Sequence, residues 1–114
     1  MGDERRQFER VPETLRVECR RLRVNWECWR GIRILDFSVG GARFESEEPY
    51  GVSEAVALQI QLPGRPSPIF LNGQISWARR KASGVTECGA AFVDTTPDQQ
   101  ADIDEMIQFL KTRA

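Results

Sequence analysis

The sequence predicts an all-β fold, an antiparallel barrel or sandwich, followed by one C-terminal helix. Over most of the chain, apolar and polar residues alternate in short runs, a period of two that is typical of half-buried strands. Turn-forming stretches with Gly, Pro and Ser separate the runs. Helical spacing of apolar residues is confined to the end of the chain, and 114 residues suit a single domain.

Alternating runs predict the strands in chain order, and two stretches between them predict clear turns. The runs are TLRVECR (14–20), GIRILDF (31–37), ARFE (42–45), AVALQIQL (55–62), IFLNGQISW (69–77) and TECGAAFVD (86–94). The turns are PGRPSP (63–68) and RRKASG (79–84). After Cys19 the phase of the apolar residues changes, which predicts a bulge or a turn near Arg20–Arg21.

The phase of the run 69–77 predicts which of its side chains enter the core. Trp77 is in register with Ile69, Leu71 and Ile75, so we expect it on the apolar face with them. Gly73 interrupts the same run and predicts either a bulge or a close approach of two backbones.

A helix is predicted at 96–112. Thr96 is suited to the N-cap, Pro97 to the first helical position, and Gln99 completes a capping-box pattern. One face carries an apolar stripe, formed by Ile103, Met106, Ile107 and Leu110. The stripe either covers the end of the barrel or offers a surface to a partner. We expect the first, because most amphipathic helices face their own core.

Composition and charge exclude several classes of protein. A net charge of −1 speaks against a nucleic-acid-binding domain. No apolar run approaches the roughly 18 residues of a membrane span, and no signal peptide precedes the domain, so we expect a cytoplasmic protein that does not bind membranes. Three dispersed cysteines and no histidine predict neither a metal site, nor a disulfide framework, nor a cofactor. No catalytic constellation is recognisable, which indicates a binding protein and not an enzyme.

Arginines gather in the first residues of the chain. Arg5, Arg6 and Arg10 lie in a segment, 1–12, that is too polar to fold by itself and that we expect to be flexible. Each guanidinium offers a planar fork that can bind phosphate or the O6/N7 edge of guanine, and it can also stack on a base. The segment is therefore suited to closing over an anionic ligand.

The stretch DFSVGG brings complementary groups, in the pattern D-x-S-x-x-G. Asp36 and Ser38 are two apart, so a strand would point both side chains to one face. A carboxylate can accept hydrogen bonds from the N–H and amino groups of guanine, and a hydroxyl can donate or accept. Gly40 and Gly41 permit positive φ and let a flat ligand approach the backbone. An Asx-turn with a glycine bend would explain the same residues without a ligand.

The order of these two motifs in an all-β chain resembles the PilZ domain family, the bacterial receptor modules for cyclic di-GMP. The resemblance is carried by Arg6 and Arg10, preceded by Arg5, and by Asp36, Ser38 and Gly41. GQISWARR and CGAAFVD resemble later strands of the family, so the similarity covers residues 4–94. It implies a six-stranded antiparallel β-barrel with a C-terminal helix, occupying 13–114 after the flexible segment 1–12.

The resemblance also implies the ligand contacts. Arg5, Arg6 and Arg10 would hold phosphates and guanine faces or edges, and Asp36 and Ser38 would bond guanine. Gly41, with Gly40 beside it, would shape the turn. Trp77 matches a position that lies against the ligand in some members, although a core or barrel-rim aromatic is the alternative. Family members bind one ligand or a stacked pair, and Arg5 would help to hold a pair.

The expected function is that of a cyclic di-GMP receptor whose N-terminal segment orders around the ligand. Because 114 residues leave no room for an output domain, we expect it to signal in trans to a partner protein of unknown identity. Two alternatives stay open. One is a ligand-independent adaptor between proteins, and the other is a small barrel that binds nucleic acid.

Overall fold

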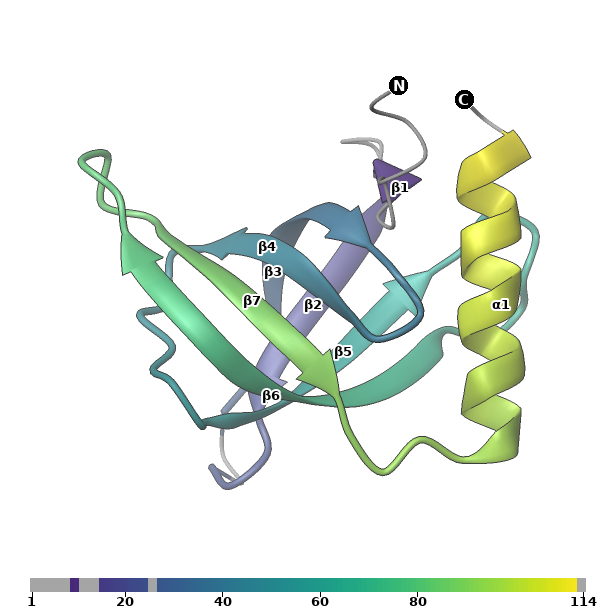
Figure 1. Ribbon diagram of the computed structural model, residues 1–114, viewed down its shortest axis with the longest axis horizontal. Helices are drawn as coiled ribbons and strands as arrows, with labels where there is room; N and C mark the ends of the chain where they lie inside the picture. Colours follow the sequence, from purple (N-terminus) through teal and green to yellow (C-terminus); the bar gives the residue numbers. More distant parts are fainter. Residues whose placement is uncertain (1–8, 11–14, 25–26, 113–114) are drawn as a thin grey trace.

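The computed structural model describes residues 9–10, 15–24 and 27–112, and they form a six-stranded antiparallel barrel with one C-terminal helix (Figure 1). A short strand, β1, is added to the barrel. The elements are β1 (Glu9–Arg10), β2 (Arg16–Arg21), β3 (Arg30–Phe37), β4 (Gly41–Ser46), β5 (Ala55–Gln61), β6 (Ile69–Arg80), β7 (Thr86–Phe92) and α1 (Pro97–Thr112).

Pairing around the barrel follows the order β3-β2-β5-β6-β7-β4, and β4 pairs back to β3 to close it. β3 pairs with β2 near its start and with β1 at its end, while β4 lies on the opposite side of that end. β6 is 12 residues long and pairs with β5 through its first half and with β7 through its second. Closure satisfies the backbone groups that the edges of an open sheet would expose.

Inward-facing side chains of the strands fill the barrel. The alternation predicted for 55–62 is confirmed, because Val56, Leu58, Ile60 and Leu62 are all buried. The other fully enclosed core residues include Cys19, Phe37, Phe44, Ile69, Leu71, Ile75 and Cys88. Burial of a large aliphatic or aromatic side chain contributes about 1.5–3 kcal/mol, so this core is the main source of the barrel's stability.

The helix α1 begins with the predicted capping box. The Gln99 backbone N–H donates to Thr96 Oγ1 at 3.1 Å, and the Thr96 N–H donates to Gln99 Oε1 at 3.0 Å. Ile103, Met106 and Leu110 are buried in the core, and α1 stands alongside one end of the barrel (Figure 1). The apolar stripe therefore covers the barrel, as expected. No helix of the described residues has the length and apolarity of a membrane span.

Glycines explain the predicted turns and one close contact. Gly64 and Gly84, in the connections 63–68 and 79–84, have φ of 87° and 98°, a region that disfavours other residues. At Gly73 a Cβ would lie 3.2 Å from the carbonyl oxygen of Ala91. Gly73 is thus a site of close backbone approach between β6 and β7 and not a bulge.

Two bulges change the direction of side chains near the ends of β3 and β6. In β3, Ile34 pairs with Phe44 but Asp36 pairs with Arg43, so Leu35 is the extra residue. In β6, Ser76 is the extra residue before Trp77. A bulge reverses the inside–outside phase of the residues that follow it. Asp36 and Trp77, which strict alternation would turn inward, therefore point outward.

Candidate functional site

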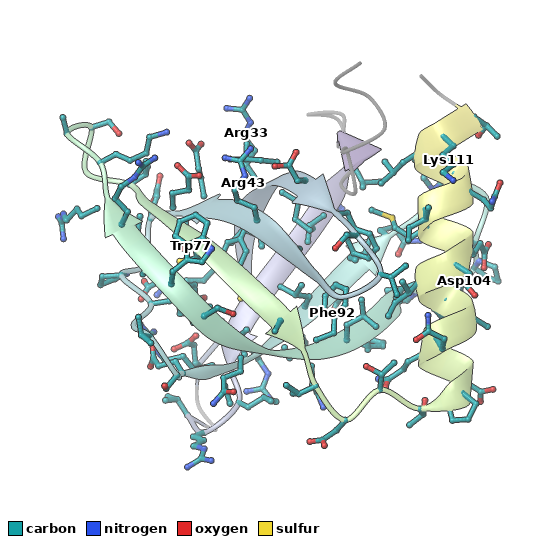
Figure 2. The ribbon with its side chains drawn as sticks, in the orientation of Figure 1. Arg33, Arg43, Trp77, Phe92, Asp104 and Lys111 are labelled. Carbon is teal, nitrogen blue, oxygen red and sulfur yellow. The ribbon has the colours of Figure 1, made fainter. Side chains whose placement is uncertain are left out.

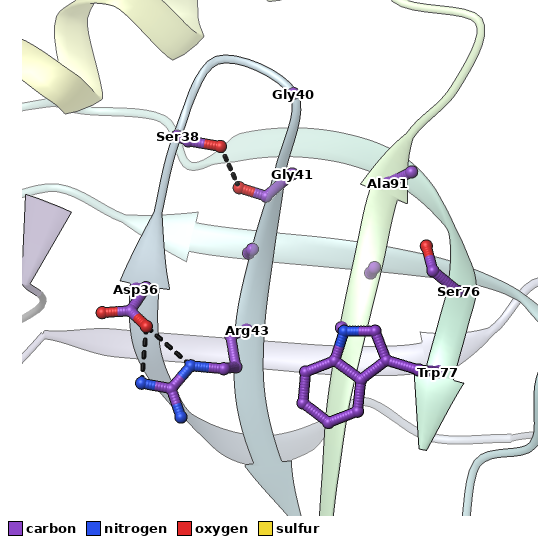
Figure 3. A pocket seen from close by; sticks show the side chains of 11 residues that line it. Asp36, Ser38, Gly40, Gly41, Arg43, Ser76, Trp77 and Ala91 are labelled. Atoms are coloured by element: carbon purple, nitrogen blue, oxygen red, sulfur yellow. Dashed lines mark hydrogen bonds and ion pairs between the residues drawn. The ribbon is translucent and has the colours of Figure 1, made fainter. Parts of the chain in front are cut away.

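A pocket of about 470 Å³ lies on the outside of the barrel, over the hairpin β3–β4 and the neighbouring strands β7 and β6 (Figure 3). Its lining residues come from three places in the sequence. They are Asp36, Ser38, Gly40, Gly41, Ala42 and Arg43; Ser76 and Trp77; and Gly89, Ala90 and Ala91. The strands therefore bring together residues that are up to 55 positions apart in the chain, as the numbers of Asp36 and Ala91 show.

One row of paired residues crosses this face of the barrel. Asp36 of β3 lies opposite Arg43 of β4, Arg43 lies opposite Gly89 of β7, and Gly89 lies opposite Trp77 of β6. We call these four residues the Asp36–Trp77 row. Residues directly opposite on neighbouring strands have Cβ atoms roughly 5 Å apart, so their side chains share one surface. On the far side of β3, the Cα of Arg10 in β1 is the partner of Asp36.

Asp36 is held by the guanidinium of Arg43. The Arg43 Nε–H donates to Asp36 Oδ2 at 2.6 Å, and Nη2 contacts the same oxygen (Figure 3). The Asp36 side chain is 18% exposed and that of Arg43 is 39% exposed, so the pair lies at the pocket wall and not in the core. A charge-assisted contact of this kind fixes the orientation of the carboxylate.

Glu87 holds the other side of Arg43. The Arg43 Nη1–H donates to Glu87 Oε2 at 2.6 Å, and the Arg79 Nη2–H donates to Glu87 Oε1 at 2.9 Å. The hydrogen bond from Arg43 lowers the pKa of the Glu87 carboxyl, against the opposing effect of burial. The bond with Glu87 in turn raises the pKa of Arg43. Glu87 thus stays ionised, and the buried carboxylate is tolerated because both of its oxygens are paired.

Ser38 begins the turn between β3 and β4. Its backbone N–H donates to the Gly41 carbonyl oxygen at 2.9 Å, and its hydroxyl reaches the same oxygen at 3.3 Å (Figure 3). The hydroxyl therefore closes the turn while it lines the pocket.

The prediction that Gly40 and Gly41 serve to allow positive φ is wrong, because neither has a φ in that region. Gly41 is required for another reason: a Cβ there would lie 2.2 Å from the carbonyl oxygen of Ala90. Gly40 has open space around its Cα, since a Cβ would meet nothing within 4 Å. Gly41 therefore lets β4 approach β7 closely at the floor of the pocket.

Trp77 is not part of the core. The predicted register with Ile69 and Ile75 fails after the bulge at Ser76, and Trp77 is 41% exposed. Its indole lies on Gly89, where a Cβ would be only 2.1 Å from Nε1. The absence of a side chain at Gly89 lets the indole lie flat on β7 and form the pocket wall that faces Arg43 (Figure 3).

Of the predicted site residues, the structure places Asp36, Ser38, Gly40, Gly41 and Trp77 around this one pocket. The backbone of Arg10 lies next to it through the pairing with Asp36. Arg5 and Arg6 lie outside the described residues, as does the rest of the segment 1–12 apart from Glu9 and Arg10 in β1.

Sequence reasoning missed two charged residues. Arg43 lines the pocket (Figure 2), and Glu87 forms an ion pair with it. Both are charged residues at polar positions of the alternating runs, Arg43 in 42–45 and Glu87 in 86–94, and this pattern could have indicated them. The alternation there turns Arg43 outward, and pairing of the two strands would have put Glu87 within reach.

The polar groups around the pocket suit recognition of a planar, hydrogen-bonding ligand. The pocket has a carboxylate, a guanidinium, a hydroxyl and an indole face. Within the described residues, no group of three or more His, Cys, Asp or Glu side chains could hold a metal ion. Burial raises the pKa of Cys19 to about 12 and that of Cys88 to about 11, so neither thiol is a nucleophile at neutral pH.

Comparison with known structures identifies the same architecture. The chain is similar to the PilZ domain of YcgR from Escherichia coli, solved with c-di-GMP, with a TM-score of 0.71 and 14% identity over 96% of this chain and 93% of that chain. It is also similar to MotI/DgrA, an inhibitor of motility from Bacillus subtilis, with a TM-score of 0.66 and 18% identity over 96% of this chain and 50% of that chain. A third similar structure is K. pneumonia MrkH in its apo state, with a TM-score of 0.69 and 16% identity over 99% of this chain and 53% of that chain.

The chain thus spans about half the length of MotI/DgrA and MrkH. No curated protein sequence matches it significantly. The model of the PilZ domain family matches residues 4–109, which is nearly the whole chain. With this match, and with a barrel and helix arranged as in a solved PilZ domain, the chain belongs to the PilZ domain family.

Proposed function

We propose that this protein is a cyclic di-GMP receptor that binds its ligand in the pocket bounded by Asp36 and Trp77. The observation that carries the proposal is the pairing of Arg10 with Asp36, because it puts the backbone of one of the proposed ligand-binding arginines next to a residue that lines the pocket. Family membership supports it, as does the similarity to a YcgR domain solved with c-di-GMP.

Guanine has the donors and the flat face that the pocket can accept. Its N1–H and N2–H groups form a pair of donors that one carboxylate, here Asp36, can accept. The Ser38 hydroxyl can serve an additional polar atom of the base or sugar. The exposed indole of Trp77 offers a surface on which a base can stack, an interaction worth about 1–3 kcal/mol per base.

The two phosphates of the ligand need cations, and Arg5, Arg6 and Arg10 are the proposed source. In this proposal, the segment 1–12 closes over the ligand, and the barrel of 13–114 provides the rigid surface beneath it. Forked, charge-assisted contacts to phosphate offset the conformational entropy that ordering the segment costs. If two ligands are bound as a stacked pair, Arg5 would help to hold them.

Signalling to a partner protein in trans completes the proposal. Val39 lies between the pocket residues Ser38 and Gly40 and is 58% exposed, and Trp77 is 41% exposed. Ligand binding would change the surface around them. A pull-down with and without cyclic di-GMP tests this step, and recovery of the same partners in both cases would indicate a ligand-independent adaptor.

Isothermal titration calorimetry with cyclic di-GMP tests the proposed function. Wild type should bind, and the isotherm gives the number of ligands per domain. Arg10→Ala should weaken binding by about 1.5–3 kcal/mol, the value of a hydrogen bond to a charged group. The matched control is Arg16→Ala, which removes an exposed arginine from β2, outside the pocket lining, and should leave the affinity unchanged. Absence of binding by wild type would refute the proposal.

A further inference from the structure

Arg43 forms ion pairs with two carboxylates, which lie on different strands. On one side, Nε and Nη2 contact a single oxygen of Asp36, and on the other side Nη1 donates to Glu87 Oε2 at 2.6 Å. Asp36 is on β3 and Glu87 is on β7, with Arg43 on β4 between them. The guanidinium therefore links β3 and β7, the strands on either side of β4, across the outside of the barrel.

Glu87 is the fixed end of this arrangement. Its side chain is only 6% exposed, and β7 pairs with β4 on one side and β6 on the other. Arg79 of β6 binds the remaining oxygen, Oε1, at 2.9 Å. A buried carboxylate with both oxygens paired has little freedom to rotate, so it holds Arg43 in one position. Glu87 itself does not line the pocket.

The fixed position of Arg43 sets the orientation of the Asp36 carboxylate. Both contacts from Arg43 go to Oδ2, so this oxygen is kept on the β4 side of the carboxylate. The other oxygen, Oδ1, points away from Arg43 (Figure 3), toward the side of β3 where β1 pairs. One oxygen is thus retained by the protein, and the orientation of the other is set by the position of the guanidinium.

We propose that Arg43 is a positioning residue, held by Glu87, that aims one oxygen of Asp36 at the N1–H and N2–H donors of guanine. This role rests on the proposed function. It adds Arg43 and Glu87, which belong to neither the arginine motif nor D-x-S-x-x-G, to the recognition of the base. The positioning of Asp36 depends on the planar guanidinium of Arg43, whose Nε and Nη2 both contact Oδ2. A lysine at this position keeps the positive charge but cannot make the paired Nε and Nη2 contacts.

The experiment compares two cyclic dinucleotides that differ in one group. Cyclic di-IMP carries hypoxanthine, which keeps N1–H but lacks the N2 amino group of guanine. If Asp36 is aimed correctly, wild type should prefer cyclic di-GMP. Arg43→Lys and Glu87→Gln should each weaken cyclic di-GMP binding by about tenfold, the equivalent of one hydrogen bond. Both should weaken cyclic di-IMP binding much less, so the selectivity for guanine should fall.

Arg65→Lys is the matched control, because it makes the same change at an arginine that also contacts two carboxylates, Asp102 at 3.0 Å and Glu105 at 3.1 Å, outside the pocket lining. It should leave both affinities within about twofold of wild type, since ion pairs near the surface contribute little and this one does not touch the pocket. The ratio of the two dissociation constants does not depend on the fraction of folded protein. A loss of fold in one variant therefore cannot imitate the predicted change.

The outcomes are distinguishable. If wild type binds neither nucleotide, the proposed function is refuted, and this role of Arg43 falls with it. If wild type binds but Arg43→Lys and Glu87→Gln keep the wild-type selectivity, the positioning role is refuted while the proposed function stands. An equal loss for both nucleotides would mean that Arg43 contributes only charge or stability, and this result would also overturn the inference.

Discussion

Two neighbouring glycines of the site should respond in opposite ways to the same substitution. In Gly41→Ala, the new Cβ would lie 2.2 Å from the Ala90 carbonyl oxygen, whereas contacts of real Cβ atoms essentially never fall under 3.0 Å. Strands β4 and β7 would have to separate locally by about 0.8 Å, the difference between these two distances. In Gly40→Ala the Cβ meets nothing within 4 Å.

The size of the effect follows from the bonds around Gly41. The Phe92 N–H, at the end of β7, donates to the carbonyl oxygen of Gly40, just before β4, at 2.9 Å. A separation of 0.8 Å stretches this bond beyond hydrogen-bond distance, and the net contribution of such a bond to stability is about 0.5–1.5 kcal/mol. Overpacking adds a cost of about 1–3 kcal/mol. We expect Gly41→Ala to lower the free energy of unfolding by about 2–4 kcal/mol.

Gly40→Ala should change the free energy of unfolding little, or raise it by about 0.4–1 kcal/mol through the lower entropy of the unfolded chain. Urea unfolding followed by tryptophan fluorescence measures both variants against wild type, with the slope on urea concentration as the check on two-state behaviour. Equal stability of the two variants would refute the close approach of β4 to β7 as the reason for Gly41.

Three further predictions concern the pocket wall, the helix and the response to pH. Trp77→Ala should weaken cyclic di-GMP binding by about 1–3 kcal/mol in calorimetry, by loss of base stacking, and a wild-type affinity would contradict a stacking role. Thr96→Ala should lower the free energy of unfolding by about 1 kcal/mol, because the capping box of α1 is lost. The pKa of Glu87 is lowered in the folded protein, so its ionised carboxylate stabilises the fold at pH values above 4.5, the ordinary pKa of the group. This contribution is lost as the pH falls through the lower pKa of the folded state. The decline of stability in acid should therefore be shallower in Glu87→Gln, and an unchanged pH profile would contradict this.

The sequence predicts the strands and the helix well because their signals are local. The alternation at Val56, Leu58 and Ile60 and the capping box at Thr96 and Gln99 each depend on residues a few positions apart. The structure agrees with both, because a repeating apolar pattern has only one way to bury its apolar face.

The directions of the site residues could not be predicted in the same way. Asp36 has the parity of Ile34, and Trp77 has the parity of Ile75, so strict alternation would turn both toward the core. The bulge residues Leu35 and Ser76 reverse this phase, and neither residue type carries a local bulge signal. The residues of the motif D-x-S-x-x-G thus line the pocket, while the geometry of the pocket depends on pairing between strands.

The links among Arg43, Glu87 and Asp36 are of the same kind. Glu87 is 44 positions from Arg43 in the chain, and only the pairing of β4 with β7 places them together. Gly41 and Gly89 are likewise explained by their neighbours on other strands, Ala90 and Trp77. A single sequence shows these residue types but not the cross-strand partners that require them.

The central claim is that cyclic di-GMP binds over the Asp36–Trp77 row. The most direct test is the ¹H–¹⁵N spectrum of the protein during titration with cyclic di-GMP, read at two tryptophan indole N–H signals. Trp77 lines the pocket, while Trp29 packs against Phe70 at 6.2 Å between ring centroids and does not line it. We predict that the Trp77 signal shifts, together with the backbone signals of Ser38 and Gly89, while the Trp29 signal stays in place. A shift of Trp29 without one of Trp77, or no change in either, would contradict the account.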